Sequence, residues 1–443
     1  MLKKLAMILI VLVICAPSLY AQTSEESEET LQQTAEKPKL GFTMNFLIGL
    51  SGYENIDGDQ VSFQRFSFFP EFSYGKWGLG LDFTFEFDGN WELRDLDDNE
   101  KADTWAEDFY QKIYYIRYGY KGEPVYGRIG AFSSYTLGHG LIMEGYGNTL
   151  FYPQVVQLGL NLDIDGSAFN FPYVGMESVV DDMLDWDIMG MRVYIRPLTG
   201  LPTPILNKLE VGATVVTDLN PKEKPTEPPK LNDASESVTE YGLDVELPLL
   251  ERQDMSLIAY ADWAKISGAG SGSFIGSTYT YRWFTLLTQL RFFGKQFVPN
   301  YFDPYYERDR SGIFTPLDKY SSLDDYIEFY VGYLIGTEMG IFNILNFYFS
   351  WSDGFNDPEG PRVQTGIGTA ENAIKMIDAS LMYDKKDIDS FEDFFSEEDS
   401  LLQLEIVYKV TKSAAIAFIY QRTYSAYSGD VTSRTLVETR FSF

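Results

Sequence analysis

Long runs in which apolar and polar side chains strictly alternate are the feature that most limits how this chain can fold. The clearest run covers residues 77–87. Its apolar positions are Trp77, Leu79, Leu81, Phe83, Phe85 and Phe87, and its polar positions are Gly78, Gly80, Asp82, Thr84 and Glu86. A period of two residues is that of a β-strand with two unlike faces. Similar runs cover residues 40–50, 156–164, 209–217, 241–247, 255–263, 327–335, 402–410 and 414–420. The sequence therefore predicts an all-β protein.

The first residues have the pattern of an export signal. Lys3 and Lys4 precede an apolar run at residues 5–14, and Ala21 ends a plausible cleavage site. This run is too short to span a bilayer as an anchor. We therefore expect a cleaved signal peptide at residues 1–21.

Cys15 offers an alternative, because a lipoprotein signal also carries a cysteine after its apolar run. The residue before it is Ile14, where a lipobox requires a small side chain, so cleavage after Ala21 is favoured. The acidic, non-periodic residues 22–39 are expected to form a disordered linker. Residues 40–443 are expected to form one domain.

The composition favours a transmembrane β-barrel. Aromatic residues make up 16% of the chain, yet mean hydropathy is only -0.17. After the signal, no segment has the 18 or so uncharged apolar residues of a membrane helix. A barrel that shows apolar side chains to lipid and polar ones to water gives such an average. A soluble β-sandwich or β-solenoid also alternates, but it does not need long strands throughout.

The spacing of turn residues predicts an antiparallel up-and-down barrel of about 16 strands, with a range of about 14–18. Several connections contain glycine or charged pairs that suit tight hairpins, whereas the segment at 219–238 carries four prolines that a strand interior would not tolerate. Short periplasmic turns are expected at residues 75–76, 121–123, 165–166, 251–254, 336–340 and 411–413. Long acidic extracellular loops are expected at residues 88–111, 133–154, 219–238, 352–371 and 384–400.

The last strand of the sequence ends on Phe441, Ser442 and Phe443. This ending resembles the signal that the barrel-assembly machinery reads in bacterial outer-membrane β-barrels of the porin or transporter type. The resemblance covers residues 40–443. It implies a location in the cell outer membrane, contact with outer-membrane lipid, and recognition of Phe441 and Phe443 by the assembly machinery. It specifies a class and no solute, and it leaves the oligomeric state open.

Strand parity predicts which charged side chains face the lumen. These residues lie opposite the apolar face of their strands and include both signs of charge, so the predicted wall is mixed. The pore-lining candidates are Glu71, Asp82, Glu86, Arg117, Arg128, Asp163, Arg192, Asp244, Glu246 and Glu328. A water-filled lumen is one interpretation, and a narrow barrel closed by ion pairs is the other.

Residues 293–323 are aromatic but not periodic. They are too long for a tight turn and are predicted to fold into the lumen as a constriction, with an ordinary external loop as the alternative. The constriction candidates are Tyr301, Phe302, Tyr305, Tyr306, Arg308 and Arg310.

No motif predicts an enzyme. The chain has one histidine, His139, which lies between two glycines and is expected to be a loop residue rather than a general base. The acidic residues within 88–108 and 384–399 could bind calcium, but their spacing matches no known loop and favours solvated loops. We expect no metal and no cofactor. The net charge of -30 argues against nucleic acid as a partner.

The predicted function is therefore passive diffusion of small hydrophilic solutes through the outer membrane, with a mild preference for cations. Two alternatives remain open at this point. One is a transporter of hydrophobic ligands, in which the aromatic residues within 293–306 would line the path. The other is a surface-binding barrel without transport.

Overall fold

The computed structural model describes residues 40–54, 60–93, 112–150, 156–222, 237–310, 319–357, 360–370, 373–398, 400–410, 414–424 and 431–442. The expected signal peptide and linker lie outside these residues. The first half of the chain contains β1 (Leu40–Glu54), β2 (Gln60–Tyr74), β3 (Trp77–Leu81), β4 (Phe83–Phe87), β5 (Ile113–Tyr118), β6 (Val125–Gly130), β7 (Gly159–Asp165), β8 (Val174–Val180), β9 (Ile188–Ile195) and β10 (Glu210–Asp218). The second half contains β11 (Val238–Arg252), β12 (Met255–Ile266), β13 (Ser271–Tyr281), β14 (Phe284–Phe293), β15 (Tyr330–Ile341), β16 (Leu345–Phe355), β17 (Arg362–Thr369), β18 (Ile377–Lys385), β19 (Ser400–Lys409), β20 (Ala414–Tyr424) and β21 (Val431–Ser442).

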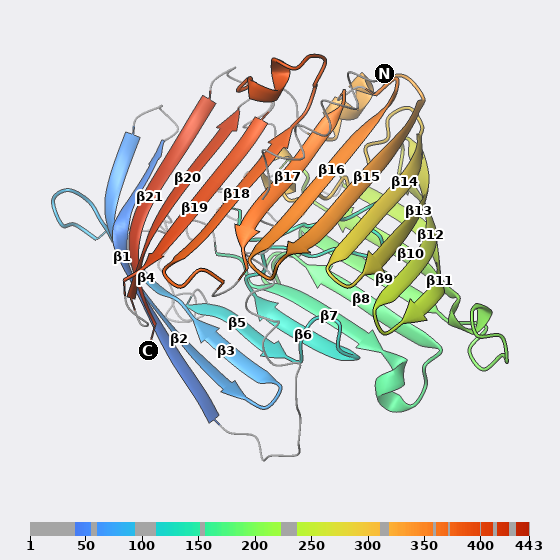
Figure 1. The fold of residues 1–443 in the computed structure, drawn as a ribbon, viewed down its shortest axis with the longest axis horizontal. Helices are drawn as coiled ribbons and strands as arrows, with labels where there is room; N and C mark the ends of the chain where they lie inside the picture. Colours follow the sequence, from blue (N-terminus) through green and yellow to red (C-terminus); the bar gives the residue numbers. More distant parts are fainter. Residues whose placement is uncertain are drawn as a thin grey trace.

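The strands form one closed antiparallel barrel (Figure 1). Sequential strands pair with one another around the wall, and β21 pairs with β1, where Phe441 lies opposite Phe46. β3 and β4 both pair with β2 and are interrupted at Asp82, so they are two parts of one strand. Within the part of the chain that the structure describes, twenty strands therefore surround the lumen, and the predicted closed up-and-down barrel is confirmed.

The predicted number of strands, about 16 with a range of about 14–18, is wrong. Residues 336–340, expected as a turn, lie inside β15, and the expected loop at 352–371 contains the end of β16 and all of β17. The glycines in these segments caused both errors. Gly336 and Gly366 occupy strand positions, but glycine also marks turns and contributes no apolar period.

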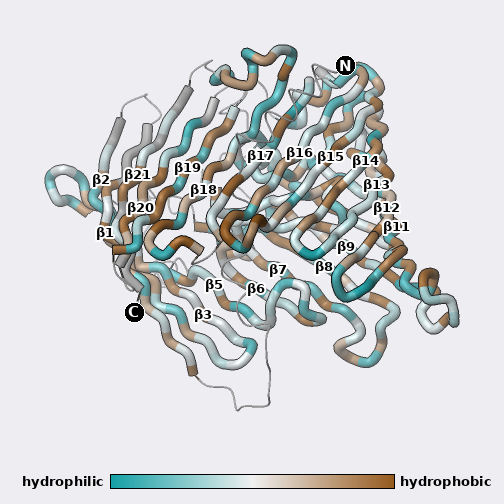
Figure 2. The backbone as a smooth tube through the Cα atoms, viewed as in Figure 1, coloured by the Kyte–Doolittle hydropathy of each residue, from teal (hydrophilic) through white to brown (hydrophobic). Residues whose placement is uncertain are grey.

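Apolar side chains lie on the outside of the wall and polar ones on the inside. On β11 and β13, Leu243 is 57% exposed and Ile275 is 61% exposed. Next to Leu243, Asp244 is only 6% exposed, and Arg192 on β9 is 3% exposed. Figure 2 shows the same interleaving of hydrophobic and hydrophilic residues along the strands. Alternation in the sequence has become a two-faced wall.

The connections differ between the two ends of the barrel. Residues 253–254 and 282–283 are tight turns at the end where β1 starts and β21 finishes, although residues 196–209 form a longer connection there. The opposite end carries the long connections at 131–158 and 294–329. Within the described residues, no helix is long and apolar enough to cross a membrane.

Parts of the two long connections fold back into the barrel. Residues 131–148, here called the first inner segment, and residues 297–310, the second inner segment, contribute to a buried apolar cluster. The cluster also contains side chains from β8 to β15, including Val216, Tyr260 and Phe293. The backbones of the two segments meet where Met143 bridges Phe302 in parallel. They therefore form a small packed unit against one side of the lumen.

Candidate functional site: the barrel interior

The tip of the first inner segment is a tight turn around His139. Gly138 and Gly140 on either side have φ values of 56° and 87°, which glycine adopts without strain. The turn is held at its base, where Tyr135 and Tyr146 exchange backbone hydrogen bonds of 2.6 and 3.0 Å. The two glycines that mark a loop in the sequence thus place the imidazole deep in the lumen.

His139 lies between two carboxylates of the wall. Its Nδ1 is 2.7 Å from Asp262 on β12, and its Nε2 is 3.0 Å from Glu246 on β11. The ring stacks on Tyr260 with 4.3 Å between the centroids. A carboxylate only accepts hydrogen bonds, so both ring nitrogens donate and the ring is an imidazolium.

The electrostatic balance around His139 supports this protonation state. Burial alone would lower the pKa of His139, but the hydrogen bonds from Asp262 and Glu246 and the charges of those residues outweigh it and raise the pKa to about 9. His139 is therefore charged at neutral pH and ties the first inner segment to the wall. The prediction of a loop residue is right, but the sequence did not indicate its ionic partners.

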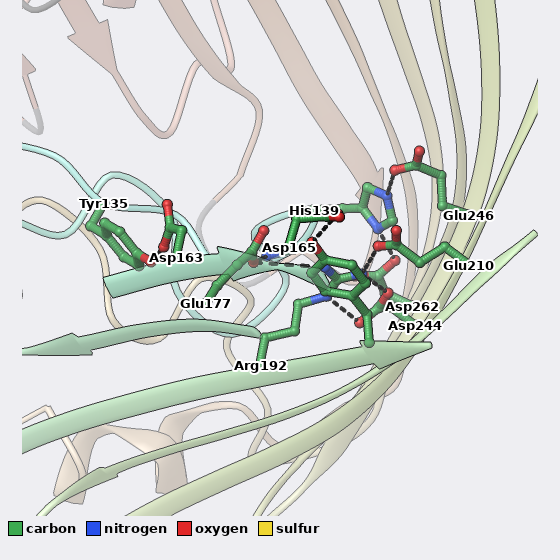
Figure 3. A network of polar contacts seen from close by, with 12 residues as sticks. Tyr135, His139, Asp163, Asp165, Glu177, Arg192, Glu210, Asp244, Glu246 and Asp262 are labelled. Carbon is green, nitrogen blue, oxygen red and sulfur yellow. Dashed lines mark hydrogen bonds and ion pairs between the residues drawn. The ribbon is translucent and has the colours of Figure 1, made fainter. Parts of the chain in front are cut away.

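Arg192 on β9 is the centre of a second ionic group close to the first (Figure 3). Its guanidinium donates two hydrogen bonds to Asp244, at 2.9 and 2.6 Å, and one to Glu210 at 2.9 Å. Glu177 lies 3.7 Å away and accepts a hydrogen bond from the backbone N–H of Gly138. The paired geometry with Asp244 is the strong, bidentate form of the arginine–carboxylate contact.

Arg310 anchors the second inner segment near the end of the barrel that carries the long connections. This buried side chain pairs with Asp187 at 3.4 Å, Asp218 at 3.3 Å and Glu307 at 3.2 Å. Burial alone would lower the pKa of Arg310, but the carboxylates of Glu307 and Asp218 raise it well above its ordinary value. The Tyr306 hydroxyl donates to Asp218 at 2.8 Å. Three buried acids thus share one arginine, and the Tyr306 hydroxyl adds a hydrogen bond to one of them.

Glu144 of the first inner segment is exposed to solvent, and the solvent-accessible space beside it is here called the passage. Its side chain is exposed and accepts a hydrogen bond from Asn300 of the second segment. Burial within the barrel raises the pKa of the Glu144 carboxyl above its ordinary value, although the charges of Arg291 on β14 and Arg362 on β17 oppose this rise. Asp303 adds to it by repulsion. Both signs of charge thus border the passage between the inner segments and the wall.

Most of the predicted pore-lining residues lie on inward faces of the wall. Those with buried side chains are Asp82, Glu86, Arg117, Arg192 and Asp244, and those that are partly buried are Glu71, Arg128, Asp163 and Glu246. Contact with a passing solute stays a prediction for all nine. The prediction that Glu328 lines the pore from a strand is wrong, because this residue is exposed in the connection before β15.

The constriction candidates differ in where their side chains lie. Tyr301, Phe302 and Tyr306 are fully buried in the apolar cluster, Arg310 is in the ionic anchor, and Tyr305 is partly exposed. The side chain of Arg308 lies outside the described residues. Residues 297–310 pack in the apolar cluster with side chains of β8 to β15, so this part of the segment 293–323 is not an ordinary external loop. Its role as a constriction stays a prediction. The exposed charge at the passage comes instead from Glu144, which the sequence did not single out.

The remaining predictions concern the chain end and the acidic loops. The backbone of Phe441 pairs with Phe46 and Ala414 at the closing seam, while Phe443 lies outside the described residues. Much of the acidic segment 88–108 is also outside. Among the residues that the structure describes, no group of three or more His, Cys, Asp or Glu side chains could hold a metal ion.

Comparisons with known proteins show only distant likeness. No family model matches the chain, and no curated protein matches it. Solved structures similar to this barrel include OpdL of Pseudomonas aeruginosa, with 9% identity, a TM-score of 0.37, and coverage of 91% of this chain and 99% of that chain. OccAB4 of Acinetobacter baumannii has 9% identity and a TM-score of 0.35, covering 92% and 98%. A mutant porin of Rh. blastica has 12% identity and a TM-score of 0.32, covering 91% and 100%. Likeness at this level carries no argument, and the barrel assignment rests on strand pairing alone.

Proposed function

We propose that this protein is an outer-membrane channel of the porin type, which passes small hydrophilic solutes and mildly prefers cations. One observation carries the proposal. The closed wall has apolar side chains outside and charged side chains inside, and the two inner segments narrow this charged interior. Strands of this kind satisfy their backbone hydrogen bonds within the sheet, so lipid can surround the wall. Inward charges of both signs suit a watery path.

The borders of the passage carry charges of both signs. Glu144 and Asp303 come from the inner segments, and Arg291 and Arg362 from the wall. Arg362 is already paired with Asp384 through hydrogen bonds of 2.9 and 2.6 Å. Asp303 is likewise paired, with Lys319 at 2.8 Å, so three carboxylates and three basic groups balance at these borders. The proposed preference for cations rests instead on the net charge of -30 of the whole chain.

The aromatic path that a transporter of hydrophobic ligands would need finds no support in this arrangement. Tyr301, Phe302 and Tyr306 are completely buried against one another and against the wall. Their ring centroids lie 4.7 to 5.6 Å apart for the pairs that involve Tyr306. These side chains are already occupied by packing and leave no aromatic surface for a ligand to follow.

Planar-bilayer recording of the refolded protein tests the proposal. We expect discrete conductance steps in KCl and a reversal potential of the cation-selective sign in a salt gradient. Glu144→Gln should lower the preference for cations, because it removes the exposed acid of the passage. Glu398→Gln is the matched control, since Glu398 is exposed in the connection before β19. Absence of steps, or anion selectivity in the unaltered protein, would reject the proposal.

A further inference from the structure

A polar cavity of about 240 Å³ lies beneath the tip of the first inner segment. His139 borders it from the segment, and Glu177, Arg192, Arg196, Glu210 and Glu246 border it from β8 to β11 and the connection after β9. The residues around Glu144 do not line it. This cavity is therefore a second place in the lumen, distinct from the space beside Glu144.

The basic groups of the cavity are already engaged. Arg192 is bound to Asp244 and Glu210, and Arg196 donates to Asp165 at 2.7 Å and to Glu210 at 3.1 Å. His139 uses both of its ring nitrogens. An anion entering the cavity would have to compete with these carboxylates for the same donors.

Two carboxylates have acceptor capacity left. Glu246 contacts His139 through Oε2, and Glu177 contacts Gly138 and Arg192 through its own Oε2. Among the described residues, no hydrogen bond reaches the Oε1 atom of either. Their side chains are 30% and 26% exposed, so both can be reached from the cavity. The hydrogen-bonding capacity that remains free in this site is therefore that of carboxylate oxygens, which accept.

The charge count points the same way. Three cations, His139, Arg192 and Arg196, face six carboxylates in the same network. The six carboxylates are Asp165, Glu177, Glu210, Asp244, Glu246 and Asp262. With all of these groups ionised, the excess is three negative charges. Enclosure by the barrel strengthens the attraction of such a site for a positive charge.

Size and geometry favour an organic cation over a bare metal ion. At about 30 Å³ per water, the cavity holds roughly eight waters or a molecule of similar bulk. A metal ion would need oxygen ligands that converge at about 2.0–2.6 Å. No group of acidic or histidine side chains in the described residues meets that requirement.

We infer that this cavity binds a small organic cation of the ammonium or guanidinium class, with Glu246 and Glu177 as its acceptors. The inference deepens the proposed function by naming a class of solute that pauses in the lumen. A planar guanidinium can donate two parallel hydrogen bonds to one carboxylate. Tyr194 also borders the cavity, but its ring already contacts Arg192 and Arg196, whose guanidinium carbons lie 4.9 and 5.0 Å from the ring centroid.

Saturation-transfer NMR on the detergent-refolded barrel tests this site with methylguanidinium and its neutral isostere methylurea. We expect saturable binding of methylguanidinium and at least tenfold weaker binding of methylurea. Glu246→Gln and Glu177→Gln should each weaken methylguanidinium binding at least tenfold, and Glu398→Gln should leave it unchanged. The second variant matters because Glu246→Gln also removes a partner of His139, whereas Glu177→Gln does not.

Equal binding of the two compounds would overturn the inference, as would binding that neither lumen variant weakens. The measurement needs neither a membrane nor a current, so it separates the two proposals. A barrel that binds methylguanidinium but shows no conductance steps would refute the channel and retain the site. A barrel that conducts but binds both compounds equally would refute the site and retain the channel.

Discussion

The contact of His139 with Asp262 and Glu246 makes the position of the first inner segment depend on pH. The pKa of this histidine rises from 6.5 to about 9 on docking, and its side chain is 12% exposed. Raising this pKa from 6.5 to about 9 corresponds to roughly 3 kcal/mol. Because the docked pKa is the higher one, this contribution is complete below about pH 6.5 and is lost as pH rises through about 9. His139→Gln should remove most of this contribution at pH values below about 9, where the unaltered protein has it.

Hydrogen exchange followed by mass spectrometry measures this docking directly. Peptides that cover residues 136–144 should be protected at pH 7 and should exchange faster at pH 10, after correction for the intrinsic rate. The expected change in the opening equilibrium is about a hundredfold or more for roughly 3 kcal/mol. In the His139→Gln variant the same peptides should be weakly protected at both pH values.

The wall provides the internal control for this experiment. Peptides from β12 should keep their protection at both pH values, because their backbone hydrogen bonds with β11 and β13 do not involve the histidine. An equally large pH dependence in the His139→Gln variant would refute the reasoning. It would mean that another titrating group, such as one of the neighbouring carboxylates, controls the segment.

Three further substitutions test the anchor and the outer wall. Arg310→Met should cost about 3–5 kcal/mol, because it leaves buried acids without their counter-charge, and a lower Tm of the detergent-folded protein would show this. Tyr306→Phe should cost about 1.5–3 kcal/mol in the same thermal assay, because Asp218 loses a hydrogen bond of 2.8 Å. Leu243→Arg should cost about 2–4 kcal/mol in urea unfolding from lipid vesicles if this 57% exposed side chain contacts lipid.

A contrary outcome for each substitution has a specific meaning. An unchanged Tm for Arg310→Met would show that the acids around it are protonated and need no counter-charge. Tyr306→Phe has little effect on packing volume, so a much larger loss would point to a role beyond the single hydrogen bond. An unchanged urea midpoint for Leu243→Arg would contradict the contact with lipid.

The alternation of side chains was sufficient to predict the two faces of the wall. The inward position of Asp244 and the outward position of Leu243 follow from the period of two, which is a property of the strand itself. The closed barrel also followed, because strands with one apolar face need both lipid outside and a complete ring of hydrogen bonds. These are local rules that a single sequence reveals.

Only the tertiary structure decided the number of strands and the content of the lumen. β17 and the interior of β15 contain glycines that can belong to strands or to turns, and only pairing with their neighbours distinguishes the two. His139 is separated by 107 and 123 residues from its two acidic partners, and Tyr146 by 161 from Glu307. Such contacts have no local pattern, because they depend on how the closed wall brings distant inward positions together. The sequence determined which side chains could face the lumen, and the closure of the barrel determined which of them meet.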